Sequence, residues 1–372
     1  MPRALFIALA GAALLAPRPA AAQAAPQSPE PGHQAIEFHG LVSTSFSYNL
    51  NGPPSRTNQL RVFDYDDDDF RIDLVELVAQ RPVASPGDFG FRVDFTAGAV
   101  SRVAAARGLF RDSTGEGQDI DLHQAFVSWV APLGSGLRLD AGKFVTGLGY
   151  EVIEGYDGWN DDATHSFLFG YAIPFTHTGV RAAYGFTTAL SAMLMVANGW
   201  DDVEDDNRGK TVHLQLGVTP SPRLAVYLNG IAGPEQTNDD VHFRDVADVD
   251  ATWKATDHLS VGLNADWGRE TNAAPLGRMA VWRGAAVYVG VAPGKSLALH
   301  ARTEVFEDRD GARTGTAQTL WEFTLTPELR LGPSVVVRSD LRLDRSDRDV
   351  FESRVGPVAT QPTASLNVLF HF

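Results

Sequence analysis

The chain of 372 residues contains no cysteine, which excludes disulfide frameworks and cysteine-based zinc sites. Beyond residue 22 it also lacks any run of about 18 apolar residues, the length that a membrane-spanning helix requires. Positive charge is scarce, since 31 Lys and Arg stand against 46 Asp and Glu, for a net charge of −15. An acidic chain without a basic patch is repelled by phosphate, which argues against nucleic-acid binding. The hydrophobic content of 44% argues against a disordered chain.

The motifs that would indicate an enzyme are missing as well. The 10 His are scattered without an H-E-x-x-H pair, and the sequence has no G-x-S-x-G elbow, P-loop or dinucleotide fingerprint. His123 and Ser128 lie on one predicted strand, but five residues of strand separate them by about 17 Å, too far for a nucleophile and its base. We therefore expect no enzymatic activity, no cofactor and no metal site.

The first 22 residues have the organisation of a secretory signal peptide. A positively charged start precedes an apolar run over 4–15, and Ala20-Ala21-Ala22 matches a cleavage site. Removing this segment removes two arginines and no acid, which takes the net charge from −15 to −17. Residues 23–35 are rich in Pro, Gln and Ala and are predicted to form a flexible segment before a single domain over 36–372.

Apolar and polar residues alternate with period two from residue 36 onward, as in strands with one apolar face. A soluble sandwich would show the same alternation. Here the polar positions carry Arg, Asp and small residues, and the strands have the length of about ten residues that a tilted bilayer crossing needs. We predict an all-β fold, a transmembrane antiparallel β-barrel. Its predicted strands number about 16: 36–49, 70–79, 89–98, 119–130, 137–147, 177–185, 190–197, 210–218, 223–231, 242–254, 258–268, 277–291, 296–306, 316–325, 329–344 and 363–372.

The predicted connections alternate in length. Outer-membrane barrels have short periplasmic turns and long outer loops, whereas a soluble sandwich has no reason to sort loops by end. The long connections predicted here are 50–69, 99–118, 148–176, 198–209, 232–241, 269–276, 307–315 and 345–362. The tight ones are 80–88, 131–136, 186–189, 219–222, 255–257, 292–295 and 326–328.

Aromatic residues fall near the ends of the predicted strands. Trp129 and Trp253 are near inner ends, and Trp200, Trp267 and Trp282 are near outer ends, as girdles at the two membrane interfaces would require.

The last predicted strand has an apolar face and ends in an aromatic residue. This pattern resembles the recognition signal of the bacterial barrel-assembly machinery. We therefore expect that machinery as a partner, together with outer-membrane lipid and lipopolysaccharide. The residues of the predicted assembly signal are Leu366, Val368, Phe370 and Phe372.

Four runs carry a family resemblance: TNQLRVFD (57–64), GLRLDAGKFVTGLGY (136–150), PFTHTGVR (174–181) and NGWDDVEDDNRGKT (198–211). They resemble the β-barrel porin-2 family, also called OmpL-like, and the similarity spans residues 36–372. The resemblance implies a porin-like barrel in the outer membrane of a Gram-negative bacterium. It implies no particular substrate and no catalytic residues.

Sixteen strands close around a lumen too wide for side chains to fill, so another segment must narrow the channel. The connection 148–176 is the longest, and loops of this length without a function are uncommon. We expect it to enter the lumen, although a surface lid with solvated acids is the alternative. The predicted constriction residues are Glu151, Glu154, Asp157, Asp161 and Asp162. The predicted lumen-wall residues are Arg71, Arg92, Arg138, Arg181, Arg302, Arg338 and Arg342, and further lumen candidates are His213, His300, Glu304 and Asp340.

These charges leave the ion selectivity open. Loop carboxylates that face wall guanidinium groups would create an electric field across the channel, which orients dipolar solutes. The alternative is that the wall charges pair with one another and only keep the lumen polar. Acids also cluster in the first outer loop, at Asp64 and 66–69, and in the fourth, at 201–206. A solvated, cation-attracting mouth is the main interpretation, and Ca²⁺ or Mg²⁺ binding is the alternative. The wall arginines favour anions instead.

The main functional hypothesis is passive diffusion of small hydrophilic solutes or ions. One alternative is a closed structural or binding barrel whose acidic loops engage cations or lipopolysaccharide. Another is a dedicated channel for anions or oligosaccharides. Wide porins are commonly trimers, but no sequence feature fixes whether this chain forms a homotrimer.

Overall fold

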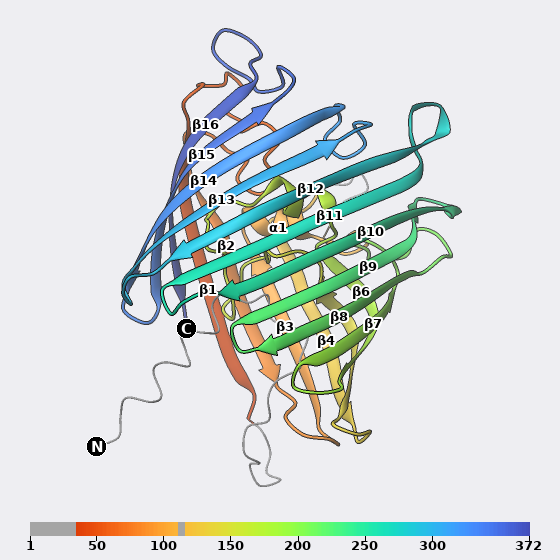
Figure 1. Cartoon of the computed structure of the whole chain (residues 1–372). Coiled ribbons are helices and arrows are strands. Elements are labelled where there is room, and N and C mark those ends of the chain that lie inside the picture. Colours follow the sequence, from red (N-terminus) through yellow and green to blue (C-terminus); the bar gives the residue numbers. More distant parts are fainter. Residues whose placement is uncertain (1–34, 111–115) are drawn as a thin grey trace.

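The structure, a computed structural model, describes residues 35–110 and 116–372. In this part of the chain sixteen antiparallel strands pair with their sequence neighbours and close into one barrel (Figure 1). The barrel closes where β1 pairs with β16, with Leu41 opposite His371 and Asn49 opposite Thr363. The predicted signal peptide lies outside the described residues. The strands are β1 (Glu37–Asn49), β2 (Asp69–Arg81), β3 (Phe89–Ala97), β4 (Ile120–Ala131), β5 (Leu137–Val145), β6 (Thr176–Gly185), β7 (Leu190–Ala197), β8 (Thr211–Ser221), β9 (Leu224–Gln236), β10 (Asp239–Lys254), β11 (Leu259–Ala274), β12 (Arg278–Val291), β13 (Leu297–Asp308), β14 (Gln318–Leu331), β15 (Val335–Ser346) and β16 (Thr360–His371).

The period-two pattern separates a polar interior from an apolar exterior. In β15 the alternate residues Arg338, Asp340 and Arg342 are at most 2% exposed, whereas Leu341 and Leu343 on the other face are 54% and 47% exposed. A barrel that is apolar outside and polar inside suits a lipid surround and an aqueous lumen. No helix within the described ranges has the length and apolar character of a membrane-spanning helix.

One predicted turn is wrong. Residues 326–328 lie inside β14, and the chain turns at 332–334 instead. Pairing between β14 and β15 stops at Leu325 and resumes at Glu328, so Pro327 sits in a gap of that ladder. Because proline has no N–H to donate, it is tolerated in such a gap, and the strand continues through it.

Two predicted long outer loops are also wrong. Residues 232–241 belong largely to β9 and β10, which are joined by 237–238 alone. Residues 269–276 belong largely to β11, which is joined to β12 by the short 3-10 turn η3 (Pro275–Gly277). In the first hairpin Pro234 pairs opposite Phe243 beside a shift in register, which lets a proline remain within a strand.

The five tryptophans of the girdle prediction divide into two groups. Trp129 and Trp253 are 36% and 51% exposed on the barrel surface near strand ends, whereas Trp267 is 42% exposed but lies in the middle of β11. Trp200 and Trp282 do not belong to a girdle, because they are 7% and 0% exposed and pack against the interior residue Arg313. Proximity to a strand end therefore did not reveal which face of the wall carries the side chain.

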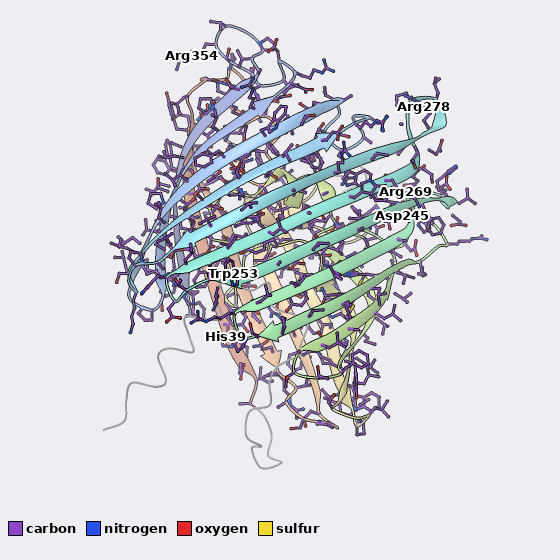
Figure 2. All side chains as sticks on the ribbon, in the orientation of Figure 1. His39, Asp245, Trp253, Arg269, Arg278 and Arg354 are labelled. Carbon is purple, nitrogen blue, oxygen red and sulfur yellow. The ribbon has the colours of Figure 1, made fainter. Side chains whose placement is uncertain are left out.

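The turns that follow the even-numbered strands and the described ends of the chain lie at one end of the barrel (Figure 1). The long loops lie at the other end, together with the tight turns 237–238 and 275–277. His39 lies toward the first end, and Arg278 and Arg354 lie toward the second (Figure 2). In β16, Leu366 and Phe370 share the outward face and are 48% and 43% exposed.

The long loops pack together inside the outer half of the barrel. The loop between β3 and β4 carries the short helix α1 (Ala99–Ala104), which contacts β2 and β4. Val100 of this helix belongs to the same buried apolar cluster as Phe63 and Phe351, from the first and last outer loops. This packing brings the outer loops close to the lumen rather than leaving all of them in solvent.

Candidate functional site: a loop-lined cavity in the barrel

The connection between β5 and β6, residues 146–175, is called the inner loop here. It lies inside the ring of strands (Figure 1) and contains one turn of π-helix, η2 (Leu168–Ala172). η2 contacts β11 and β12, and its apolar residues share a buried cluster with the inward-facing Trp282 and Phe306. Burying one such aliphatic or aromatic side chain contributes about 1.5–3 kcal/mol, so this cluster fixes one end of the inner loop on the wall.

Wall carboxylates bind the backbone of the inner loop directly. Glu304 accepts hydrogen bonds from the N–H groups of Phe167, at 2.6 Å, and Leu168, at 3.0 Å. Asp340 accepts from the N–H of Thr164 at 2.7 Å and from its hydroxyl at 2.8 Å. These four hydrogen bonds join two wall acids to consecutive stretches of the loop backbone, so the two acids position the loop.

Two further wall acids contact the loop at other points. Glu76 of β2 accepts from the N–H of Tyr156 at 2.6 Å, and Asp248 of β10 accepts from the N–H of Gly149 at 3.3 Å. Neither residue was predicted as a site residue from the sequence. The signal that could have identified Glu76 and Asp248 is an acid at an inward-facing position of a strand.

Buried arginines hold the side chains of the inner loop. Arg302 is 1% exposed and contacts Glu151 at 3.1 Å, Asp162 at 3.7 Å and its strand neighbour Glu322 at 3.0 Å. Its guanidinium also donates to the carbonyl of Thr164 at 2.6 Å. The guanidinium group of Arg302 thus lies within ion-pair distance of three carboxylates where the loop contacts the wall.

Arg338 and Arg342 continue this arrangement along β15. Arg338 contacts Glu154 at 2.8 Å and donates to the carbonyl of Asn160 at 2.6 Å. Arg342 contacts Asp344 at 2.8 Å and donates to the carbonyl of His165. Both arginines are at most 2% exposed, so they lie between the loop and the wall rather than on an open channel surface.

The charge of Asp162 depends on its buried surroundings. Burial raises the pKa of Asp162 to about 7; the nearby Arg302 acts against this rise and Asp340 adds to it. The carboxyl also accepts a hydrogen bond from Thr326 at 2.7 Å. Asp162 is therefore not a permanent negative charge at neutral pH, unlike an ordinary exposed aspartate.

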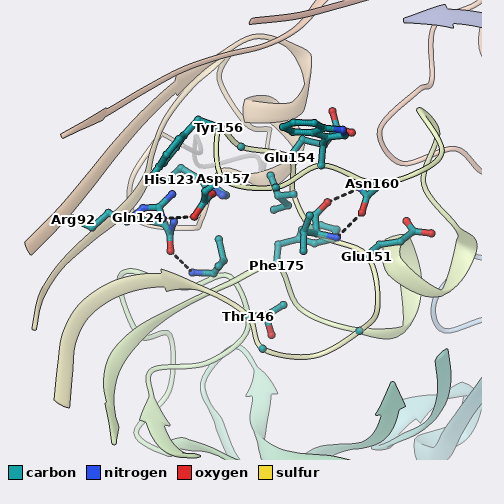
Figure 3. A pocket seen from close by; sticks show the side chains of 18 of the residues that line it. Arg92, His123, Gln124, Thr146, Glu151, Glu154, Tyr156, Asp157, Asn160 and Phe175 are labelled. Carbon is teal, nitrogen blue, oxygen red and sulfur yellow. Dashed lines mark hydrogen bonds and ion pairs between the residues drawn. The ribbon is translucent and has the colours of Figure 1, made fainter. Parts of the chain in front are cut away.

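A cavity of about 710 Å³ lies between the inner loop and the inward faces of several strands, β2 to β6 and β8 to β10 among them. Arg92 and Gln124 lie on one side of it, and Glu151 and Asn160 lie on the other (Figure 3). All five predicted constriction acids line this cavity. Glu151 is only 4% exposed and accepts from Ser166 and Tyr288, so it anchors the loop as well.

The predicted wall arginines separate into three positions. Arg92, Arg138, Arg181 and Arg302 line the cavity, whereas Arg71 lines a separate small pocket of about 30 Å³. Arg338 and Arg342 lie behind the loop, as described above, and are not lining residues of this cavity.

Carboxylates accompany the arginines that line the cavity. Asp140 lies 2.9 Å from both Arg138 and Arg181. Arg92 contacts Asp94 at 2.8 Å and, across the cavity, Asp157 of the inner loop at 2.9 Å. The predicted facing of loop acid and wall guanidinium thus occurs as direct ion pairs, and Asp94 and Asp140 are partners that the sequence analysis did not identify.

Five of the ten acids in the two outer-loop clusters form ion pairs, so these clusters are not simply solvated. Asp202 and Asp206 both contact Arg107, which joins the second and fourth outer loops. Asp64 contacts Arg61; burial acts to raise the pKa of Asp64, but the adjacent guanidinium groups outweigh it and hold the pKa below its usual value. Within residues 35–110 and 116–372, no three His, Asp or Glu side chains are grouped as a metal ion requires.

The family of the chain follows from a comparison with known proteins. A family profile described as "Putative beta-barrel porin-2, OmpL-like" matches residues 35–372, essentially the whole chain. The chain belongs to this family. It is an outer-membrane channel protein of the porin type, located in the outer membrane of a Gram-negative bacterium, as the resemblance in the sequence implied.

Solved structures agree on the fold. Pseudomonas putida OprB is 13% identical with a TM-score of 0.62, over 91% of this chain and 94% of that one. The channel DcaP of Acinetobacter baumannii is 11% identical with a TM-score of 0.61, over 91% and 97%. An anion-selective porin from Comamonas acidovorans is 10% identical with a TM-score of 0.59, over 91% and 99%. At these identities the likeness concerns the fold alone. A comparison with curated proteins found no match.

Proposed function

We propose that this porin passes small hydrophilic solutes and ions by passive diffusion, and that the inner loop narrows its path. The cavity between the inner loop and the wall carries the proposal, because it is lined by charged and hydrogen-bonding side chains from both sides. Such a lining compensates the lost hydration of a polar solute and disfavours apolar ones. Diffusion through it needs no cofactor and no energy input, and we expect no enzymatic activity.

The same lining favours cations over anions. The guanidinium groups of Arg138 and Arg181 are both close to Asp140, and that of Arg92 is close to Asp94, so their positive charge is partly cancelled. The inner loop adds acids and contains no Lys or Arg. The anion selectivity named for the Comamonas porin is therefore not transferred to this chain.

The second candidate is a barrel that is closed at rest and serves a structural or binding role. The apolar cluster shared by the outer loops and the inner loop favours it, because this packing occupies part of the outer lumen. The barrel-assembly machinery and lipopolysaccharide are proposed partners in either case. One structure of Vibrio cholerae OmpT is titled a trimer form, and a homotrimer is proposed for this chain on that analogy.

The proposed narrowing role of the loop acids can be tested by neutralising two of them. Glu154→Gln together with Asp157→Asn removes two negative charges that line the cavity while keeping side-chain size. We expect the preference for K⁺ over Cl⁻, measured from the reversal potential across a KCl gradient, to fall. Unchanged selectivity and conductance would argue against the inner loop as the constriction.

A matched control variant removes the same two residue types elsewhere. Asp257 pairs with Arg223 in a short turn, and Glu307 pairs with Arg283 outside the cavity lining. Asp257→Asn with Glu307→Gln therefore loses equal charge and equal numbers of ion pairs. Its reversal potential should match that of the wild type, since neither carboxylate faces the solute path.

A further inference from the structure

Three acids on the lumen face of β10 and β11 lack a cationic partner. Asp248, Asp250 and Asp266 are 1%, 2% and 4% exposed, and Asp248 lies directly opposite Asp266 in the ladder. Among the residues that the structure describes, none of the three forms an ion pair with Lys, Arg or His. A buried carboxylate without a compensating cation or hydrogen-bond donor is costly, so such a group either holds a proton or takes a cation from the lumen.

The three carboxylates differ in how their oxygens are satisfied. Asp248 accepts from the side-chain amides of Asn229, at 2.6 Å, and Asn264, at 2.7 Å. Asp250 receives only a long contact of 3.3 Å from Asn229 on one oxygen, and its other oxygen has no partner. Asp266 receives no hydrogen bond from an N–H or hydroxyl donor, but its carboxyl shares one with the facing carboxyl of Asp248. The demand for a donor is therefore concentrated on Asp250.

Asp250 is the member of this group that reaches the cavity. It lines the cavity together with Gln215 and Tyr227 from neighbouring strands and with Tyr150 and Asp161 of the inner loop. Asp248 and Asp266 are not lining residues. Asp250 is therefore the member of the three that lies nearest to a solute inside the cavity, and its unpartnered oxygen is buried in the wall at that point. A second carboxylate, that of Asp161, is among the other lining groups.

The spacing of the acids favours an organic cation over a metal ion. Residues two apart on one strand face are roughly 7 Å apart, and the described residues contain no grouping that could hold a metal. A protonated amine instead carries three N–H donors on a carbon chain, which can bond one carboxylate and reach toward another. The phenol rings of Tyr150 and Tyr227 offer apolar surface for that carbon chain.

We propose that Asp250 anchors a subsite for the protonated amino group of small organic amines that pass through the channel. The inference rests on the proposed diffusion function, and it adds a class of solute that the channel retains transiently. The amino group satisfies the free oxygen of Asp250, and the arginine-bearing side of the cavity, at Arg138 and Arg181, repels it. Amines therefore concentrate on the β10 side of the path.

The test uses 1,4-diaminobutane as the probe and 1,4-butanediol, which has the same length without charge, as its control. Single-channel currents in KCl should be interrupted by the diamine at neutral pH and not by the diol. In Asp250→Asn, checked for folding by heat-dependent gel mobility, half-block should need a diamine concentration about tenfold higher, as the loss of one charge-assisted hydrogen bond predicts. Asp257→Asn, which removes an exposed acid outside the cavity, should behave as the wild type.

The outcomes separate the subsite from the pore. Diamine block that is lost in Asp250→Asn and kept in Asp257→Asn supports the subsite. Wild-type channels that conduct in KCl but show no diamine block, or equal block in Asp250→Asn, overturn the subsite while the diffusion function stands. Folded wild-type protein that gives no current steps in KCl overturns the diffusion function, and the subsite with it.

Discussion

Replacing Arg302 with methionine is expected to lower the free energy of unfolding by about 3–5 kcal/mol, the usual cost of removing one partner from a buried ion pair. Arg302 is 1% exposed and lies within 3.7 Å of carboxylate oxygens of Glu151, Asp162 and Glu322. Methionine has a comparable unbranched chain but no charge. The substitution leaves these carboxylates without their shared guanidinium and removes the donor to the carbonyl of Thr164.

Equilibrium urea unfolding in lipid vesicles, followed by tryptophan fluorescence, measures this loss. The matched control is Arg223→Met, because Arg223 pairs with Asp257 of a second short turn and both side chains are more than half exposed. Exposed pairs contribute little, so the control should unfold close to the wild type. Equal unfolding of the two variants would contradict the view that Arg302 anchors the inner loop to the wall.

Removing the tip of the inner loop is expected to widen the channel. Replacing residues 153–159 by Gly-Gly is geometrically feasible, because the side chain of Asn160 bonds both the N–H of Val152, at 2.9 Å, and its carbonyl, at 2.8 Å. The removed segment contains two aromatic residues that reach the wall. The ring centroid of Tyr156 lies 4.2 Å from that of His39 of β1, and the ring centroid of Trp159 lies 4.7 Å from that of His371 of β16. Single-channel conductance should rise roughly twofold or more, since conductance follows the narrowest part of the aqueous path.

The control for this excision alters the tip of an outer loop instead. Arg354 lies at the far end of the barrel (Figure 2), and its neighbour Val355 is 93% exposed. Arg354→Gly with Val355→Gly introduces the same two glycines without changing the cavity lining. Its conductance should equal that of the wild type. A loop-tip excision that leaves conductance unchanged would show that another segment limits the flow.

The strand pattern could be predicted from sequence because one physical constraint repeats along the chain. Every strand of a barrel in lipid must alternate an apolar face with a polar one, so each of the sixteen strands carries the signal independently. The errors arose where a predicted connection proved to be part of a strand. Pro327 and Pro234 lie in two such connections, and each occupies an interruption of regular pairing within a strand. Strand continuity there depends on neighbouring strands, which local sequence does not show.

The composition of the site could be predicted, but its pairings could not. Alternation places Arg92 and Arg338 on the lumen face, yet it does not show that Arg92 meets Asp157 while Arg338 lies behind the loop with Glu154. Those contacts depend on the path of the inner loop across the barrel. That path is set by apolar packing of η2 and by wall acids such as Glu304, at positions far apart in sequence.

Single-channel recording of the refolded protein in planar bilayers, with the reversal potential measured across a KCl gradient, tests the central claim most directly. Heat-dependent gel mobility of the same sample shows that the barrel is folded. The diffusion channel described here predicts steady current steps and a reversal potential of the sign that marks cation preference, because the cavity arginines are accompanied by carboxylates. Folded protein that gives no steps would contradict the account and favour the closed barrel.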